Sequence, residues 1–213
     1  MSTIDSDGVD WRLEGKRYNR VHHRIKRIAG IINRMPNCEK AFDVGCSGGK
    51  LGALLNERIS YYGCDIVPEV VEEQDPERFA LWNVEKDDID KLPFEEESFQ
   101  CIVMSGLFEH VGDREYVLDK IKNLLVPGGS VVLSYANPEF LGYSTGVMIR
   151  SEDAGCIARL LSQKRLVNLF ESKNFALRRV YHLSYFVFYP TISILSKLLH
   201  PFTNQYLYEF SLG

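Results

Sequence analysis

The chain has 213 residues, of which 45% are hydrophobic and 25% are charged, and its formal net charge is −4. This length and composition are those of one ordinary folded domain with a sizeable core. The mild negative charge gives no overall reason to expect a polyanion such as a nucleic acid as partner.

Five scattered cysteines form no CxxC pair, which argues against a zinc site and against a disulfide framework. We therefore expect reduced thiols, no bound metal and a cytoplasmic location. The first residues show no basic start followed by an apolar core, so nothing in them predicts secretion.

Residues 1–10 are small, polar and acidic, and we expect a flexible N-terminus there. Residues 11–35 are basic, and their apolar side chains recur at helical spacing, which predicts an amphipathic helix ending near Pro36. The apolar positions are Val21, Ile25, Ile28 and Ile32. The basic face fits either a contact with nucleic acid or an anionic membrane, or a solvated surface on a helix packed over the fold. The solvated surface is the favoured interpretation.

Residues 41–55, with the sequence AFDVGCSGGKLGALL, predict a strand, a tight glycine loop and the first turns of a helix. The glycines let a backbone approach a ligand closely, and a helix start offers N–H groups to an anion. Apolar runs predict further strands at residues 59–64, 79–82, 99–105, 130–135, 175–183 and 206–212. Further helices are expected to begin near Pro68, Asp113 and Ser162.

Residues 184–199 are rich in aromatic and aliphatic side chains but are interrupted by Pro190 and contain Lys197. Because this stretch is shorter than the roughly 20 apolar residues that cross a bilayer, we expect a core or edge helix. The minority interpretation is an interfacial patch that meets a lipid-linked acceptor.

Strands that alternate with helices predict a parallel sheet with right-handed crossovers and helices on both faces. In such a sheet the ligand lies at the carboxyl ends of the strands, where the strand order reverses beside the first strand. Two nucleotide-binding patterns do not fit the glycine loop at that position. The GxGxxG fingerprint needs glycine where Ser47 and Lys50 stand, and a P-loop needs Ser or Thr where Leu51 stands.

A different pattern does fit, in which an acid precedes two spaced glycines and a second acid ends the next strand. Its residues are Asp43, Gly45, Gly49 and Asp65. Later segments continue the pattern in order: Asn83-Val84-Glu85, LPFEEESF at 92–99, Glu109-His110-Val111 and LVPGG at 125–129. Together these segments cover about residues 40–135, and they resemble the class I S-adenosylmethionine-dependent methyltransferases.

This resemblance implies a Rossmann-like, doubly wound α/β fold with a seven-stranded sheet that is mostly parallel and has an antiparallel last strand. It implies S-adenosylmethionine as the cofactor and S-adenosylhomocysteine as its product. The residues predicted to bind the cofactor are Asp43, Gly45, Cys46, Ser47, Gly49, Asp65, Ile66, Asn83, Val84, Ser105 and Leu107.

At the adenosine end, a carboxylate accepts hydrogen bonds from both ribose hydroxyls, and Asp65 stands where it can do so. We expect the Asn83 amide to pair with the adenine amino group and the Val84 N–H to meet a ring nitrogen. Ile66 and Leu107 either sandwich the adenine or belong to the ordinary core.

At the amino-acid end, we expect backbone groups of Gly45, Cys46 and Ser105 to hold the cofactor. Asp43 is expected to fix either the loop or the ammonium group. Cys46 is not predicted to be a nucleophile, because no cation or base can be paired with it from the sequence.

Methyl transfer from a sulfonium is an in-line displacement, so alignment and exclusion of water supply most of the catalysis. His110 is the candidate general base for acceptors that must lose a proton, and a structural role in the local turn is the alternative. Tyr18, Tyr143 and His182 are candidates for the acceptor pocket.

We therefore predict a single methyltransferase domain at residues 11–213, with acceptor specificity in residues 136–199. The acceptor is expected to be a small molecule, with oxygen or carbon favoured, because residues 105–108 lack the Asn/Asp-Pro-Pro-Tyr/Phe signature of members that methylate amino groups. Two alternatives stay open: a non-catalytic S-adenosylmethionine-binding protein, and an RNA-directed methyltransferase that uses the basic helix.

Overall fold

The structure is a computed structural model that describes residues 23–140, 160–183 and 203–213. The predictions made for residues 1–22 and 184–199, and for Tyr18 and Tyr143, lie outside these ranges.

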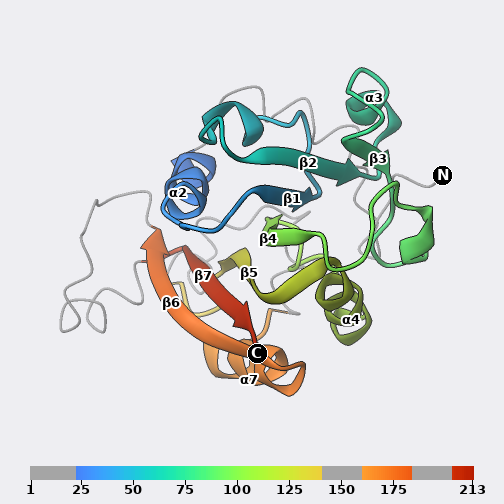
Figure 1. Ribbon diagram of the computed structural model, residues 1–213. Helices are drawn as coiled ribbons and strands as arrows, with labels where there is room; N and C mark the ends of the chain where they lie inside the picture. Colours follow the sequence, from blue (N-terminus) through green and yellow to red (C-terminus); the bar gives the residue numbers. More distant parts are fainter. Residues whose placement is uncertain (1–22, 141–159, 184–202) are drawn as a thin grey trace.

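A seven-stranded sheet forms the centre of the molecule (Figure 1). Its strands are β1 (Lys40–Val44), β2 (Ser60–Asp65), β3 (Phe79–Leu81), β4 (Phe99–Ser105), β5 (Leu125–Ala136), β6 (Phe175–Leu183) and β7 (Gln205–Leu212). The strand order is β3-β2-β1-β4-β5-β7-β6, and the pairs among β1 to β5 are parallel. Strand β7 is antiparallel to both of its neighbours, so the predicted mixed sheet with an antiparallel last strand is confirmed.

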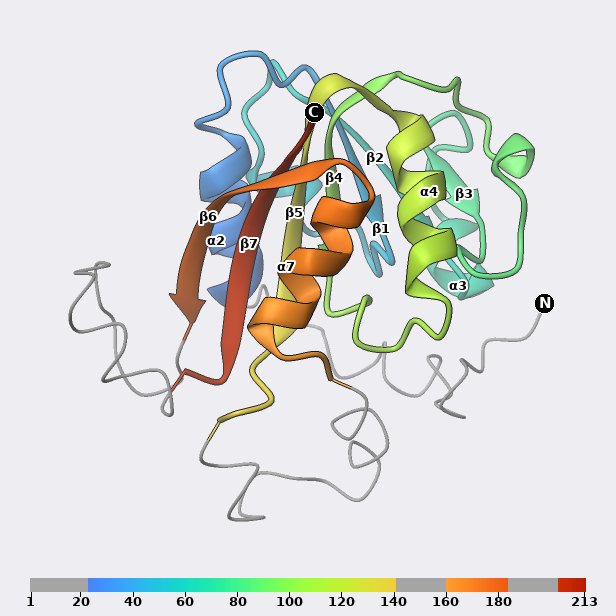
Figure 2. The same ribbon diagram turned by 90° about the horizontal axis from the view of Figure 1, so that it is seen from below.

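Helices cover both faces of this sheet (Figure 2). Helix α2 (His23–Ile32) lies on one face, and α4 (Arg114–Leu124) and α7 (Gln163–Ser172) lie on the other. Each face has its own apolar core: Ile28 and Ile32 of α2 belong to one cluster, and Ile121 of α4 and Phe170 of α7 belong to the other. The doubly wound arrangement expected from alternating strands and helices is therefore present.

Local sequence signals explain the helix starts. The Asp113 carboxylate accepts a hydrogen bond from the Tyr116 N–H at 3.0 Å, and the Ser162 hydroxyl accepts one from the Arg165 N–H at 3.4 Å. Each side chain satisfies a backbone donor that has no partner within its helix. Pro68 begins the short helix α3 (Pro68–Val71), where its missing N–H costs nothing.

Two sequence predictions differ from the structure. The helix expected after the glycine loop is only the one-turn 3₁₀ helix η2 (Gly52–Leu54), because three glycines within residues 48–52 disfavour a longer helix. The fifth strand begins at Leu125 rather than Ser130, and its register with β4 shifts across the Pro127-Gly128-Gly129 segment.

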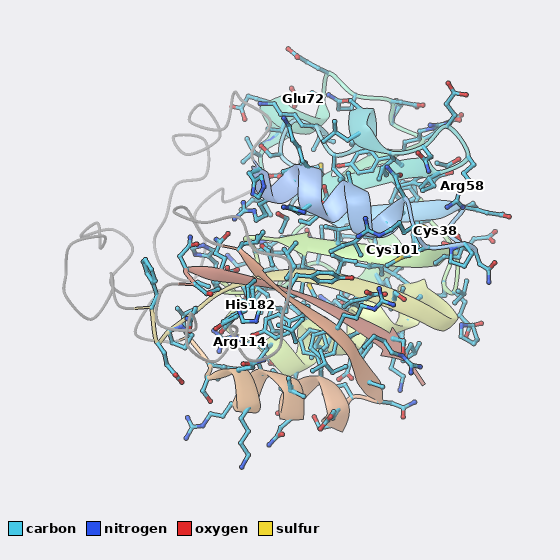
Figure 3. The ribbon with its side chains drawn as sticks, turned by 90° about the vertical axis from the view of Figure 1, so that its left-hand side faces the viewer. Cys38, Arg58, Glu72, Cys101, Arg114 and His182 are labelled. Atoms are coloured by element: carbon cyan, nitrogen blue, oxygen red, sulfur yellow. The ribbon has the colours of Figure 1, made fainter. Side chains whose placement is uncertain are left out.

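Arg58, which follows η2, stabilises the segment that leads into β1 (Figure 3). Its guanidinium donates to the carbonyl oxygens of Met35 at 2.7 Å and Cys38 at 2.9 Å, so one side chain holds the turn that leads out of α2. Cys38 and Cys101, which Figure 3 labels beside it, are buried in the core on the α2 side of the sheet. Cys38 lies just before β1 and Cys101 lies on β4, so this core joins two neighbouring strands of the sheet.

Candidate functional site

A cleft of about 170 Å³ lies at the carboxyl ends of β1, β2, β3 and β4. This is the point beside β1 where the strand order reverses, as the alternating pattern predicts. Nine of the eleven residues predicted to bind the cofactor line the cleft, and Gly49 and Asn83 do not. The nine are Asp43, Gly45, Cys46, Ser47, Asp65, Ile66, Val84, Ser105 and Leu107.

The glycine loop owes its shape to residues in the left-handed backbone region. Gly45 and Gly49 have φ of +76° and +65°, values that glycine adopts without steric cost. Ser47 has φ of +48° and is held there because its N–H donates to the Asp65 carboxylate at 2.8 Å. Gly49 does not line the cleft and lies instead beside Phe79 and Tyr61. It contributes to the shape of the loop.

Asp65 joins the loop to the end of β2. One carboxylate oxygen accepts from Ser47 N–H at 2.8 Å and the other from Val67 N–H at 3.1 Å. Burial raises the pKa of Asp65, and the hydrogen bonds from the Ser47 and Val67 N–H groups oppose this rise. Each oxygen keeps a second lone pair, so the carboxylate can still accept from a vicinal diol.

Asp43 is almost fully buried at the floor of the cleft. Burial raises its pKa to about 7, while a hydrogen bond from the Tyr61 hydroxyl at 2.8 Å opposes the rise. The other carboxylate oxygen, Oδ1, has no hydrogen-bond donor within the described residues. A buried oxygen of this kind, facing a cleft, fits a cationic ligand group such as an ammonium.

Arg24 is a cleft residue that was not among the predicted ones. Although it belongs to the basic helix, it lines the cleft, and a Cβ placed on Gly106 would lie 3.1 Å from its Nη2 atom. The sequence held a signal for this orientation, because Arg24 lies three residues after Val21 and four before Ile28, on the apolar stripe. Lys26 and Arg27 of the same helix are exposed.

The loop after β3 departs from its predicted role at one position. The Asn83 side-chain oxygen accepts from the N–H groups of Glu85 at 3.0 Å and Lys86 at 3.2 Å, which makes Asn83 a turn residue. Its neighbours Trp82 and Val84 line the cleft. The structure therefore places Val84, rather than Asn83, at the wall of the cleft.

Polar groups also gather after β4. Glu109 is buried, accepts from the Ala136 N–H at 3.2 Å, and has a pKa raised by burial. His110 is held in the same turn, where its N–H donates to the Leu107 carbonyl at 2.9 Å, but it does not line the cleft. His182, on β6, lies 3.3 Å from the Thr203 hydroxyl and is also outside this cleft.

Comparison with known proteins identifies a methyltransferase domain in this chain. Residues 42–133 match the family described as "Methyltransferase domain", and this segment contains most of β1, β2 to β4, α4, most of β5 and nearly every residue of the cleft. Residues 42–133 are therefore a methyltransferase domain, and this match is consistent with the predicted resemblance to the class I S-adenosylmethionine-dependent methyltransferases. The cofactor of these methyltransferases is S-adenosylmethionine, and the residues present fit it. The cleft holds the Asp65 carboxylate, which can accept from a diol, and a buried Asp43 oxygen that has no hydrogen-bond donor among the described residues.

The curated relatives of this methyltransferase are distant. The mitochondrial ubiquinone biosynthesis O-methyltransferase of Mus musculus is 26% identical over 179 residues, which are 77% of this chain and 46% of the relative. The ubiquinone/menaquinone biosynthesis C-methyltransferase UbiE of Methylococcus capsulatus is 25% identical over 125 residues, 53% of this chain and 49% of the relative. The chain thus spans about half the length of these relatives.

Solved structures share the fold. An S-adenosylmethionine-dependent methyltransferase of Archaeoglobus fulgidus superposes with a TM-score of 0.64 at 14% identity, covering 94% of this chain and 99% of that chain. The plantazolicin methyltransferase BamL, solved with S-adenosylhomocysteine, superposes with a TM-score of 0.66 at 12% identity, covering 94% and 89%. Among the residues that the structure describes, no helix has the length and apolarity needed to cross a membrane.

Proposed function

We propose that this methyltransferase moves a methyl group from S-adenosylmethionine to a small-molecule acceptor, with oxygen or carbon as the favoured atom. The observation that carries the proposal is the charge pattern of the cleft. Asp65 lines the cleft at the end of β2 and can accept from a ribose, while Asp43 and Arg24 bring opposite charges near each other in the same cleft. An amino-acid zwitterion carries the complementary pair of charges.

Each side chain then has a defined role in holding the cofactor. Asp65 accepts from the ribose hydroxyls, Asp43 accepts from the ammonium, and Arg24 donates to the carboxylate. The Val84 N–H, which donates no hydrogen bond to the described residues, is available to a ring nitrogen of adenine. The bound cofactor supplies an electrophilic methyl group, and the chain's contribution is to orient it and to exclude water.

A proton acceptor is needed only where the acceptor atom must lose a proton. His110 is the proposed base, and the neighbouring Glu109 carboxylate is the second candidate, because both come shortly after β4, whose last residue, Ser105, lines the cleft. A raised pKa, as burial produces for Glu109, brings a carboxylate nearer to the range in which it can accept a proton at neutral pH.

The acceptor class is proposed from the relatives. Since those relatives are named as O- and C-methyltransferases of quinone biosynthesis, phenols and quinols are the first acceptors to test. A lipid-linked acceptor belongs to the same test, because such quinols carry apolar tails. A cytoplasmic location and a domain spanning residues 11–213 remain predictions.

The donor site is tested by calorimetry with S-adenosylhomocysteine. We expect Asp65→Ala and Arg24→Gln each to weaken binding by about tenfold to a hundredfold, because each removes a charge-assisted hydrogen bond. Lys26→Gln, an exposed change on the same helix as Arg24, is the matched control and should bind like the wild type. Tight binding that neither cleft substitution changes would refute the site assignment.

The reaction is tested by following transfer of labelled methyl groups from S-adenosylmethionine to phenols, to quinols with short and long tails, and to RNA. Methylated phenol or quinol supports the proposal. Donor binding without transfer to any acceptor supports a non-catalytic binding protein instead. Labelled RNA, with an affinity that falls as salt rises, supports the RNA-directed alternative.

A further inference from the structure

Lys120 is a buried cation on α4 with no role in the contacts described so far. Only 6% of the residue is exposed, although lysine is almost never buried unless its ammonium is satisfied. Its Nζ donates to the carbonyl oxygens of Val84 at 2.9 Å and Asp87 at 2.6 Å. The same nitrogen lies 3.9 Å from the centre of the Tyr116 ring and 5.7 Å from that of Trp82.

All of these contacts, except that with Tyr116 on α4 itself, are made to the loop that follows β3. Within this loop the Trp82 indole donates to the Asp88 carbonyl at 3.0 Å, and the Asn83 N–H donates to the Asp87 carboxylate at 2.8 Å. Lys120 approaches the loop from the core side and bridges two of its carbonyls, three residues apart. The loop is therefore closed on itself by hydrogen bonds and anchored to α4 by one ammonium group.

This loop also forms one wall of the cleft. Trp82 and Val84 line the cleft, and Lys120 holds the carbonyl of Val84 from the opposite side. Fixing that carbonyl limits rotation of the peptide that follows Val84, and so limits the backbone angles that direct the Val84 N–H. Hydrogen bonds are strongly directional, so a donor that turns away by some tens of degrees loses most of its interaction.

We propose that Lys120 is a positioning residue for purine recognition: by clamping the Val84 and Asp87 carbonyls, it aims the Val84 N–H at an acceptor nitrogen of the base. This inference rests on the proposed function, since it concerns the adenine end of the same cleft. It also predicts that the cleft prefers adenine to hypoxanthine. Adenine N1 is an acceptor that can meet an N–H, whereas N1 of hypoxanthine carries a hydrogen and repels it.

The experiment measures the affinity of the full chain for S-adenosylhomocysteine and for S-inosylhomocysteine by calorimetry. The variant is Lys120→Met, which keeps the length and apolar volume of the stem but removes the ammonium. Lys122→Met on the same helix is the matched control, because Lys122 makes no hydrogen bond to residues 82–88 in the described part of the chain. Thermal denaturation of each variant shows whether it is folded.

We expect the wild type to prefer S-adenosylhomocysteine and Lys120→Met to lose about tenfold in that affinity, with little change for S-inosylhomocysteine. Lys122→Met should keep the preference. If Lys120 had only a general structural role, Lys120→Met would weaken the binding of both ligands equally. That result, or no change in either affinity, overturns the inference, whereas binding of the donor product to the wild type still supports the proposed function.

Two other outcomes are also decisive. If the wild type binds neither ligand, the proposed function fails, and the inference fails with it. If Lys120→Met does not fold, Lys120→Gln, which keeps an uncharged donor, is measured in the same way. If neither variant folds, Lys120 stabilises the whole fold rather than positioning the loop, and the inference is overturned.

Discussion

Asp43 should limit both the stability of the ligand-free protein and the pH range in which the donor binds. Its carboxyl group is buried, and its pKa is raised to about 7 from an ordinary value of 3.8. Replacing Asp43 by Asn removes the ionisation but keeps a carbonyl oxygen that can accept from the Tyr61 hydroxyl, which now donates at 2.8 Å. The substitution therefore tests the charge with little change in shape.

The stability effect follows from proton linkage. Because the pKa of Asp43 is higher in the folded state, the folded protein holds a proton that the unfolded chain releases between about pH 4 and pH 7. The contribution of Asp43 to the free energy of unfolding is therefore fully present below about pH 4 and is lost as the pH rises through 7. At about 1.36 kcal/mol per pH unit, the full loss is at most about 4 kcal/mol. Asp43→Asn should avoid this loss, so the ligand-free variant melts higher than the wild type at pH 8 and not at pH 4.

The binding effect has the opposite sign. If the ionised carboxylate accepts from the donor's ammonium, only the ionised fraction of the protein binds well. With a pKa of about 7, that fraction falls about tenfold from pH 8 to pH 6, and the affinity should fall by the same factor. Asp43→Asn should bind weakly at both pH values and show a flat profile.

Calorimetry from pH 5.5 to 8 with S-adenosylhomocysteine measures this directly. Methylthioadenosine, which lacks the amino-acid group, is the matched control ligand, and its affinity should not change with the charge of Asp43. Equal binding of S-adenosylhomocysteine at pH 6 and pH 8, or the same pH dependence for both ligands, would contradict this role of Asp43.

Three further substitutions test neighbouring features. Tyr61→Phe removes the hydrogen bond that lowers the pKa of Asp43, so the midpoint of the binding profile should move to higher pH. Gly63→Ala places a Cβ 2.8 Å from the Cys46 Sγ and should destabilise the fold by about 1 to 3 kcal/mol in urea denaturation. Asp113→Ala removes the cap of α4 and should cost about 1 kcal/mol in the same assay, with donor affinity unchanged.

Much of the fold could be predicted from the sequence because its signals are local. The strand at residues 99–105 is a nearly continuous apolar run, and the caps at Asp113 and Ser162 act on N–H groups three residues away. The prediction of a helix after the glycine loop was wrong, because the leucines at helical spacing did not outweigh the glycines among them. The predicted start of the fifth strand was also wrong, because pairing with β4 begins before the Pro127-Gly128-Gly129 segment.

The resemblance to methyltransferases and most of the cleft could be read from the sequence, because the order and spacing of Asp43, Gly45 and Asp65 place them at neighbouring strand ends in a parallel sheet of this kind. Which polar side chains turn inward could be seen only in the folded structure. Arg24 enters the cleft, Asn83 is used within its own turn, and Lys120 is buried beneath the loop. These orientations depend on the residues that each side chain contacts in the folded protein. Contacts between residues far apart in the chain produce no periodic pattern in the local sequence, so they could not be predicted from it.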